Sequence, residues 1–335
     1  MHESWRSFLA PMVGITENPG FLHQCKKHGC DVLVLPMIFM EGITHDPSFI
    51  DNQLGLLFNA PGGFSFRPLI VQVIGTNQDQ ARIAMDHLAS YDLDGINLNL
   101  GCPSSKLSKS SAGAYMLDAP EKRDGMITTL ERYSPFPFSI KIRLLGGRNP
   151  DVGRSKAFCK SLEGSGIDWM SIHGRTRKQG YSGVARWDII KEIHDFSSIP
   201  LIGNGDIKHA LQGNELVKSS HADAFMIGRA AIADPKVFDA TGSAPSSLEV
   251  DLAIKLGLYE DLFGFLEKYS ATRVDHFLSL HERKRWLLYF SRGARNARIF
   301  RARVSSIKDL ESLEDLVTAI MTRDDNNNEN KSPSC

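Results

Sequence analysis

The chain has 335 residues, 42% of them hydrophobic, so it can form one large domain and a smaller one with packed interiors. Lysine plus arginine equals aspartate plus glutamate at 39 each, so any nucleic-acid surface must be a local patch. No apolar run approaches the roughly 20 residues that cross a bilayer, and no signal peptide is apparent. We therefore expect a soluble, cytoplasmic protein with no membrane contact.

The first 230 residues contain short apolar runs, each too brief for a helix, separated by stretches with helical patterning. Alternation of strand and helix implies a parallel sheet. Eight such units favour a closed (β/α)8 barrel, a TIM barrel, over an open doubly wound sheet with its early Gly-x-Gly-x-x-Gly turn. The predicted strands are residues 7–12, 32–36, 69–73, 95–99, 139–143, 169–173, 201–203 and 224–228.

The chain divides after this barrel, which we place in residues 1–240. Residues 240–247 are small and polar, with one proline, and are interpreted as a linker. Beyond them the strand signals stop, and continued helical patterning predicts an all-helical C-terminal domain in residues 247–322. The Asn-rich stretch 323–335 has no apolar periodicity, so we predict a disordered tail.

The loops that follow the seventh and eighth predicted strands are rich in glycine. They are Asn204-Gly205-Asp206 and Gly228-Arg229. Glycine lets backbone N–H groups approach an anion, and arginine adds a charge, so the two loops predict a phosphate site and a phosphorylated cofactor. The alternative is that the glycines only form tight turns.

Ionisable side chains gather at the ends of two neighbouring predicted strands. Lys141 and Arg143 alternate along one strand and so point the same way, into the barrel mouth. His173 and Arg175 end the next strand, and Tyr181 follows them. A lone inward Lys or His is more often a satisfied core residue, but this cluster favours a site for an anionic ring system.

Cys102 follows the fourth predicted strand beside Asn99. A cysteine thiol, with an ordinary pKa of about 8.5, is mostly protonated near pH 7 and can act as a general acid. A nucleophilic role would need a base such as His173, and a structural role is a further alternative. Gln72 ends the third strand, where its amide suits either the edge of a heterocycle or a capped strand end.

The other cysteines predict no chemistry. The total of five is odd and includes no Cys-x-x-Cys pair, which argues against a disulfide framework and against a zinc site. We therefore expect reduced thiols and no metal. Cys25 and Cys30 are interpreted as packing residues, because free cysteine is among the most buried residue types.

Seven segments resemble the tRNA-dihydrouridine synthases, flavoenzymes with an FMN barrel and a helical RNA-binding domain. They occur in the family's order, and the Asn-x-Gly-Cys-Pro element at residues 99–103 is specific among flavin barrels. The segments are residues 9–12, 95–104, 112–114, 141–143, 172–176, 203–206 and 227–229.

The resemblance implies reduction of FMN by NADPH, then hydride transfer from flavin N5 to C6 of a tRNA uracil and protonation at C5. It implies that Cys102 is the proton donor. Asn99, Arg143 and Tyr181 would hold the uracil, and Arg175 is grouped with them. The implied flavin contacts are Pro11, Met12, Val13, Gln72, Lys141, His173, Asn204, Gly205, Asp206, Gly228 and Arg229.

Two positions depart from the family's pattern. Leu35-Pro36 replaces a common Thr-Glu after the second strand, which bears on substrate contacts at that rim. Ser111 replaces a frequent glycine in the loop that covers Cys102. Neither position belongs to the implied cofactor contacts.

Residues 283–303 carry eight basic residues and no Asp or Glu. In a continuous helix a spacing of three would spread Arg292, Arg295, Arg298 and Arg301 around about half the circumference, giving a broad patch that suits folded RNA. The alternative is a solvated helix balanced by acidic neighbours such as Asp309 and Glu311. The predicted RNA contacts are Arg283, Lys284, Arg285, Arg292, Arg295 and Arg298.

Other functions remain open from the sequence. An FMN barrel that acts on a free metabolite, such as a dihydroorotate or enoate reductase, would not need the basic helical domain. An RNA chaperone would not need Cys102. The modified uridine and a ribosomal RNA substrate are also left open. We expect a monomer without a stable protein partner.

Overall fold

The computed structural model describes residues 1–241, 251–269 and 271–329. The predicted linker at 240–247 lies outside the described residues except for its first two positions, and so do the last six residues of the predicted tail. In the described part of the chain, no helix is long and apolar enough to cross a membrane.

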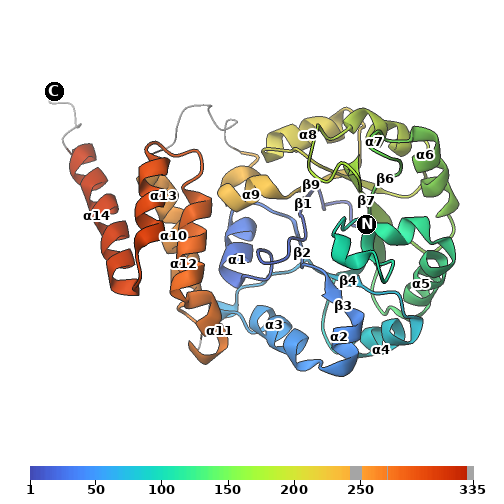
Figure 1. Cartoon of the computed structure of the whole chain (residues 1–335), viewed down its shortest axis with the longest axis horizontal. Coiled ribbons are helices and arrows are strands. Elements are labelled where there is room, and N and C mark those ends of the chain that lie inside the picture. The colour runs from blue at the N-terminus through green and yellow to red at the C-terminus, as the bar shows by residue number, and fades with distance from the viewer. Residues whose placement is uncertain (242–250, 270, 330–335) are drawn as a thin grey trace.

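Eight parallel strands close into a barrel, which confirms the predicted TIM-barrel fold (Figure 1). The hydrogen-bonded order follows the chain, and the last strand pairs back with the first. A ninth, two-residue strand, β3 (Ile38–Phe39), was not predicted and pairs with the C-terminal end of β4. The barrel strands are β1 (Ser7–Leu9), β2 (Val32–Val34), β4 (Leu69–Ile74), β5 (Gly95–Leu100), β6 (Phe138–Leu144), β7 (Trp169–Thr176), β8 (Leu201–Asn204) and β9 (Ala224–Ile227).

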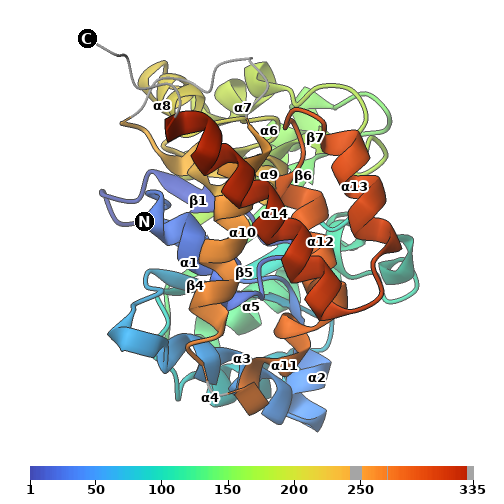
Figure 2. The same ribbon diagram turned by 90° about the vertical axis from the view of Figure 1, so that its left-hand side faces the viewer.

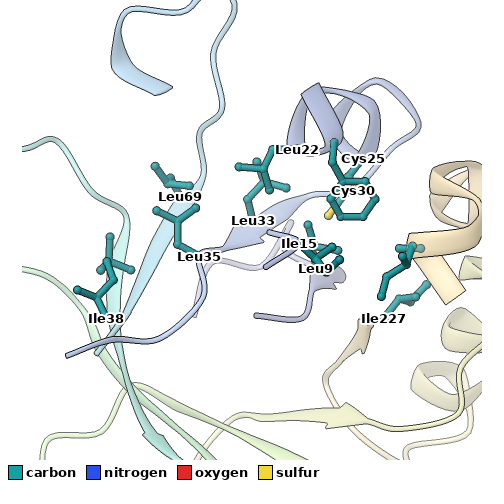
Figure 3. Packing of buried hydrophobic residues seen from close by; sticks show 14 of the residues in the cluster. Leu9, Ile15, Leu22, Cys25, Cys30, Leu33, Leu35, Ile38, Leu69 and Ile227 are labelled. Atoms are coloured by element: carbon teal, nitrogen blue, oxygen red, sulfur yellow. The ribbon is translucent and has the colours of Figure 1, made fainter. Parts of the chain in front are cut away.

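Successive residues of a strand pack on opposite sides of the barrel wall. Phe8 and Val32 belong to the cluster that fills the interior, together with Trp169. Leu9 and Leu33 belong instead to the layer between strands and helices, where Figure 3 shows them near Ile15 and Leu22. Because both faces of the wall are covered, strands such as β2 and β9 are apolar at every position.

Helices surround the barrel, and several begin at a residue that caps them. Asn18 accepts the N–H of Phe21 at the start of the first helix, and Asn77 caps the fourth in the same way. The helices are α1 (Pro19–Lys27), α2 (Met40–His45), α3 (Ser48–Phe58), α4 (Gln78–Leu88), α5 (Pro120–Tyr133), α6 (Val152–Ser161), α7 (Trp187–His194), α8 (Ala210–Lys218) and α9 (Arg229–Ala233).

The C-terminal region is helical and lies against α1 and α9 of the barrel (Figures 1 and 2). Its last helix passes the predicted boundary at 323, so residues 323–329 are helical where disorder was expected. The backbone hydrogen bonds of a helix form within the helix itself. Polar residues can therefore extend a helix whose apolar residues hold it against the rest of the protein. The helices are α10 (Leu252–Leu266), α11 (Ala271–Leu278), α12 (Leu280–Phe290), α13 (Ala297–Ser306) and α14 (Leu310–Glu329).

The barrel and the helices share one hydrophobic core. Trp286 of α12 is fully buried, and its ring centroid lies 5.0 Å from that of Phe21 in α1. The helices α1 and α10 cross so closely that a Cβ on Gly20 would lie 2.6 Å from the carbonyl oxygen of Leu262. Cys25 and Cys30 are buried in the same core (Figure 3), and burial raises the pKa of Cys30 to about 12.

Candidate active site

A cavity of about 840 Å³ opens at the carboxyl ends of the barrel strands. All the residues predicted for cofactor, substrate and catalysis line this cavity except Arg175. They come from segments between residues 10 and 232 that are far apart in the sequence. The closed barrel brings them together because the carboxyl ends of parallel strands meet at one rim.

A chain of hydrogen bonds between side chains begins at Asn99 and Gln72 in the cavity wall. Asn99 donates to Gln72 over 2.7 Å, and Gln72 donates to Asn97, also over 2.7 Å. Asn97 in turn donates to Ser139 over 2.9 Å. These bonds run from β4 through β5 to β6, so the orientation of the Gln72 amide is set by its neighbours.

Asn99 also holds the backbone that presents Cys102. Its side-chain oxygen accepts the N–H of Gly101 at 3.1 Å and that of Cys102 at 2.9 Å. The N–H of Ala114 donates to the Cys102 carbonyl at 3.0 Å from the other side. The side-chain amide of Asn99 is therefore engaged within the protein, and it fixes the position of the thiol at the cavity wall.

The loop over Cys102 contains Ser111 in a left-handed conformation, with φ of +59°. Glycine adopts a left-handed conformation without the steric cost that a side chain brings. This explains why a glycine is frequent at this position in the family that the chain resembles. The departure from the family's pattern thus changes the residue at a position whose backbone still adopts a conformation suited to glycine.

Lys141 points its ammonium group into the cavity and donates to the side-chain oxygen of Asn204 over 3.0 Å. Burial, together with the nearby charge of Arg143, lowers the pKa of Lys141 to about 7. Few groups in the described residues act to raise the pKa of Lys141 again, and no carboxylate among them forms an ion pair with its ammonium group. Such a site favours an anionic ligand.

His173 is nearly buried beside this cation. Burial, followed by the charges of Lys141 and Arg143, lowers the pKa of His173 to about 2, so the imidazole is neutral. A terminal nitrogen of Arg175 lies 3.4 Å from its Nε2. Because a guanidinium only donates, Nε2 accepts and Nδ1 is left as the N–H donor.

Arg143 connects two loops at the rim. Its Nε donates to the carbonyl of Gly101 over 2.8 Å, and one terminal nitrogen donates to that of Gly180 over 2.8 Å. Tyr181 is 60% exposed at the cavity mouth, and the guanidinium of Arg229 lies 4.6 Å from its ring centroid. The mouth therefore presents an aromatic face flanked by cations.

Arg175, which was predicted to contact the substrate, does not line the cavity. Arg175 is only 2% exposed and lies behind the cavity wall. It pairs with Asp206 over 2.6 Å and donates to the carbonyl of Gly183 over 2.7 Å. Its place beside His173 at the end of the strand did not put it at the rim, because β7 departs from regular pairing with β6 beyond His173.

The loops after β8 and β9 form a cradle with little room for side chains. A Cβ on Gly205 would lie 2.7 Å from the Cβ of Ala185, and one on Gly228 would lie 3.3 Å from that of Ala10. Within the described residues, the backbone N–H groups of Gly205, Asp206 and Gly228 have no hydrogen-bond acceptor. Free N–H groups in such a concave loop suit a phosphate.

Asp206 lies in this cradle and carries a negative charge of its own. Burial opposes ionisation, but the N–H of Ala185 and the ion pair with Arg175 lower the pKa of Asp206 overall. Its second oxygen lies 3.2 Å from Arg229. Two arginines therefore compensate the carboxylate, which orients Arg229, while the backbone of Asp206 is the part that can serve an anion.

The cavity has lining residues that were not predicted. Met37 follows β2 and lies 3.6 Å from the side-chain nitrogen of Asn99, and Met226 and Ile232 are further apolar contributors. Lys208 adds a cation next to the cradle. Apolar side chains carry no catalytic pattern in a sequence, and only their position after a predicted strand could have pointed to them.

Two of the predicted RNA contacts are structural residues. Arg283 is only 9% exposed, pairs with Glu267 over 2.6 Å and lies over the ring of Phe263. Lys284 donates to the carbonyls of Ser305 and Ile307, at the C-terminal end of α13. The sequence pattern did not reveal this, because their acidic and carbonyl partners lie outside residues 283–303.

The basic segment is not a continuous helix. Gly293 and Asn296 have left-handed φ angles of +76° and +58° and separate α12 from α13. Arg292, Arg295 and Arg298 are exposed around this turn, and none of the ion pairs in the described residues involves them. These three arginines form the exposed arginine patch.

Solved structures of low sequence identity share the fold. The chain superposes on 6-hydroxypseudooxynicotine amine oxidase of Pseudomonas geniculata N1 with a TM-score of 0.52 and 9% identity, over 69% of this chain and 46% of that one. It superposes on histamine dehydrogenase of Rhizobium sp. 4-9 with a TM-score of 0.51 and 11% identity, over 78% and 49%. The chain thus spans about half the length of these two proteins.

Sequence comparisons point to one family. The chain is 32% identical over 298 residues to the probable tRNA-dihydrouridine synthase of Rhizobium leguminosarum bv. phaseoli, covering 86% of both chains. It is 31% identical over 241 residues to tRNA-dihydrouridine synthase B of Escherichia coli K12, covering 70% of both. The family model for dihydrouridine synthase matches residues 8–323. The chain therefore belongs to the dihydrouridine synthase family.

Proposed function

We propose that this protein reduces the C5–C6 double bond of uridine in transfer RNA, with FMN as its flavin and NADPH as its reductant. Membership of the family makes it a flavin-dependent oxidoreductase. The observation that carries the proposal is the cavity itself, in which a cation, a neutral imidazole and a cysteine thiol lie at one rim beside a cradle of unengaged backbone N–H groups.

The cradle and the wall at Gln72 fit FMN from its two ends. Unengaged N–H groups of Gly205 and Gly228, with Arg229 beside them, suit a terminal phosphate, which free riboflavin lacks. Lys141 and the Gln72 amide would meet the polar edge of the ring system. A cavity of about 840 Å³ lies within the range of roughly 300–1,000 Å³ usual for such ligands.

The bound flavin would supply a hydride from N5 to C6 of uracil. The chain's own part is to complete the reduction and to stabilise charge. Cys102 would give its proton to C5 as a general acid, held in place by Asn99. Lys141, protonated beside an anionic ring, would stabilise that charge through a group already in position.

The target base must leave the RNA stack to reach this cavity, at a cost of a few kcal/mol. Tyr181 offers a ring at the mouth on which a base could stack. One terminal nitrogen of Arg143 has no partner among the described residues and could donate to a uracil carbonyl. Asn99 would act on the substrate mainly by positioning Cys102.

The RNA outside the cavity would contact the exposed arginine patch. No carboxylate in the described residues forms an ion pair with Arg292, Arg295 or Arg298. Their charges are therefore available to bind phosphates. We propose that the protein acts as a monomer. Compounds that have no RNA backbone to contact these arginines would be poor substrates.

The test is turnover with defined substrates. Purified protein with FMN and NADPH should form dihydrouridine in unmodified tRNA, measured by mass spectrometry of the digested nucleosides. Orotate, a simple enone and ribosomal RNA serve as competing substrates. Turnover of orotate or the enone without any RNA product would support the metabolite reductase instead. Mapping dihydrouridine in cells with and without the protein would identify the uridine.

A further inference from the structure

The loop between β1 and α1 forms one wall of the cavity and is built as a tight turn. Met12 and Val13 line the cavity, and the N–H of Met12 donates to the hydroxyl of Thr16 over 2.9 Å. Gly14 has a left-handed φ of +80°, and its N–H donates to the carboxylate of Glu17 over 2.6 Å. The backbone beside the flavin position therefore depends on the Glu17 side chain.

Glu17 has no arginine or lysine within ion-pair distance among the described residues. One of its carboxylate oxygens accepts from Gly14, and the other is enclosed without a hydrogen-bond partner in the described part of the chain. Burial raises the pKa of Glu17, while the N–H groups of Gly14, Glu17 and Ile15 and, as the smallest of these contributions, the charge of Arg285 oppose that effect. A carboxylate in this setting needs a compensating positive charge nearby.

Arg285 of α12 lies on the other side of this turn. A Cβ on Gly14 would lie 3.7 Å from one of its terminal nitrogens, and the other terminal nitrogen lies 2.6 Å from Glu282 on the same helix. Its side chain is only 27% exposed, and its Nε is enclosed without a partner among the described residues. Arg285 therefore faces the barrel, unlike the exposed arginine patch seven residues further on.

The same helix reaches the second part of the flavin site. α12 packs against α9, which begins at Arg229 directly after the cradle glycine Gly228. Trp286, next to Arg285 in sequence, is fully buried against Phe21 of α1. The C-terminal region thus supports the flavin cavity at two loops through one helix.

We propose that Arg285 is a positioning residue for the flavin, which balances Glu17 across the interface and so holds the turn at Gly14 against the cavity. It acts from the helical region that was predicted to bind RNA. The proposal rests on the proposed function for the identity of the ligand, FMN. Its consequence is that docking of the helical region sets flavin affinity.

The experiment compares Arg285→Met with Arg292→Met, a matched loss of charge from the exposed arginine patch. FMN affinity is measured by quenching of flavin fluorescence, and tRNA affinity by filter binding at several salt concentrations. Arg285→Met should weaken FMN binding about tenfold and leave tRNA affinity within about twofold, whereas Arg292→Met should do the reverse. Excess FMN should restore kcat to Arg285→Met with an unchanged KM for tRNA, and Arg285→Lys should retain most of the FMN affinity.

Wild-type FMN affinity in Arg285→Met, with weakened tRNA binding, would overturn the proposal and return Arg285 to the RNA contacts. A wild-type protein that binds no FMN would instead overturn the proposed function. Should Arg285→Met fail to fold, combining it with Glu17→Gln decides the matter, because the amide still accepts from Gly14 but needs no counter-charge. The combined variant should fold and bind FMN within about threefold of wild type, and a combined variant as defective as Arg285→Met contradicts the pairing.

Discussion

At the scale of single residues, Cys102 is held through its backbone and not through its thiol. Asn99 accepts its N–H, Ala114 donates to its carbonyl, and no hydrogen bond within the described residues reaches its sulfur. The thiol is left at the cavity wall, beside the apolar side chains of Met37 and Leu107. This arrangement is suited to a group that must transfer a proton to a ligand and take no other partner.

Cys102→Ala should bind FMN with wild-type affinity and accept electrons from NADPH, because neither step uses the thiol. Dihydrouridine formation should fall by about 10²–10⁴-fold, the usual contribution of a positioned general acid. Rapid-mixing absorbance follows flavin reduction, and nucleoside mass spectrometry follows product.

Cys159→Ala is the matched control, since Cys159 is a buried cysteine of α6 outside the cavity. It should keep turnover close to that of the wild type. Undiminished product formation by Cys102→Ala would remove Cys102 from the mechanism.

Lys141 allows a test of the electrostatics through pH. Its pKa is lowered from 10.5 to about 7, so between these values the unfolded chain binds a proton that the folded chain lacks. The free energy of unfolding of the flavin-free protein should therefore increase with pH across this window, and this contribution is lost as pH falls through about 7.

Urea unfolding of flavin-free wild type and Lys141→Met at about pH 7.5 and about pH 9.5 measures this contribution. The increase should be smaller in Lys141→Met, which cannot titrate at this position, and the same variant should bind FMN more weakly. Parallel pH profiles for the two proteins would show that Lys141 keeps an ordinary pKa.

At the scale of elements, the break between α12 and α13 decides which basic residues reach solvent. In a continuous helix Arg295 and Arg298, three residues apart, would lie on one face, but the left-handed residues Gly293 and Asn296 reorient the chain on either side of Arg295. The buried positions Ala294, Ala297 and Phe300 alternate with the arginines and anchor the turn. The arginines are thereby left without acidic neighbours.

Replacing Arg295 and Arg298 together with Ala should weaken tRNA binding and reduce the slope of log affinity against log salt by about 1 to 2, because up to two phosphate contacts are lost. FMN affinity should not change. Filter binding over a range of salt concentrations measures the slope.

Lys122→Ala with Arg132→Ala removes the same charge from exposed positions of α5 on the barrel's outer wall. This control should preserve the salt slope. Equal losses in both double variants would mean that net charge, and not the exposed arginine patch, governs RNA binding.

At the scale of the whole molecule, the helical region completes the barrel. Phe21 and Leu22 of α1 belong to the same core as Trp286 and Leu262 of the C-terminal helices. Lys255 is nearly buried and pairs with Asp234 after α9 over 2.7 Å. An interface with a continuous apolar core and a buried ion pair resembles a domain interior, not a contact between separable domains.

A protein truncated after residue 241 should therefore be aggregation-prone and bind little FMN, because the outer face of α1 would be exposed to water. The full chain should unfold in one transition seen equally by circular dichroism and by flavin fluorescence. Solubility, FMN titration and urea unfolding check both expectations. A soluble truncated barrel with wild-type FMN affinity would contradict them.

The barrel was predictable because each strand can be recognised from a short local stretch of sequence. Runs such as residues 32–34 and 224–227 are apolar throughout since both faces are covered, and closure then places residues such as Cys102, Lys141 and His173 at one rim. The unexpected β3 has only two residues, too few to form a pattern. Ser111 stands out only once its φ is known.

By itself, the sequence determined the barrel, the family and the residues around the cavity, because these depend on local periodicity and on short motifs at strand ends. The tertiary structure alone decided the roles of Arg175 and Arg283, which look like surface cations but meet carboxylates contributed by distant segments. Spacing along a chain predicts which way a side chain points from its own helix or strand. It cannot predict which charge another element brings to meet it.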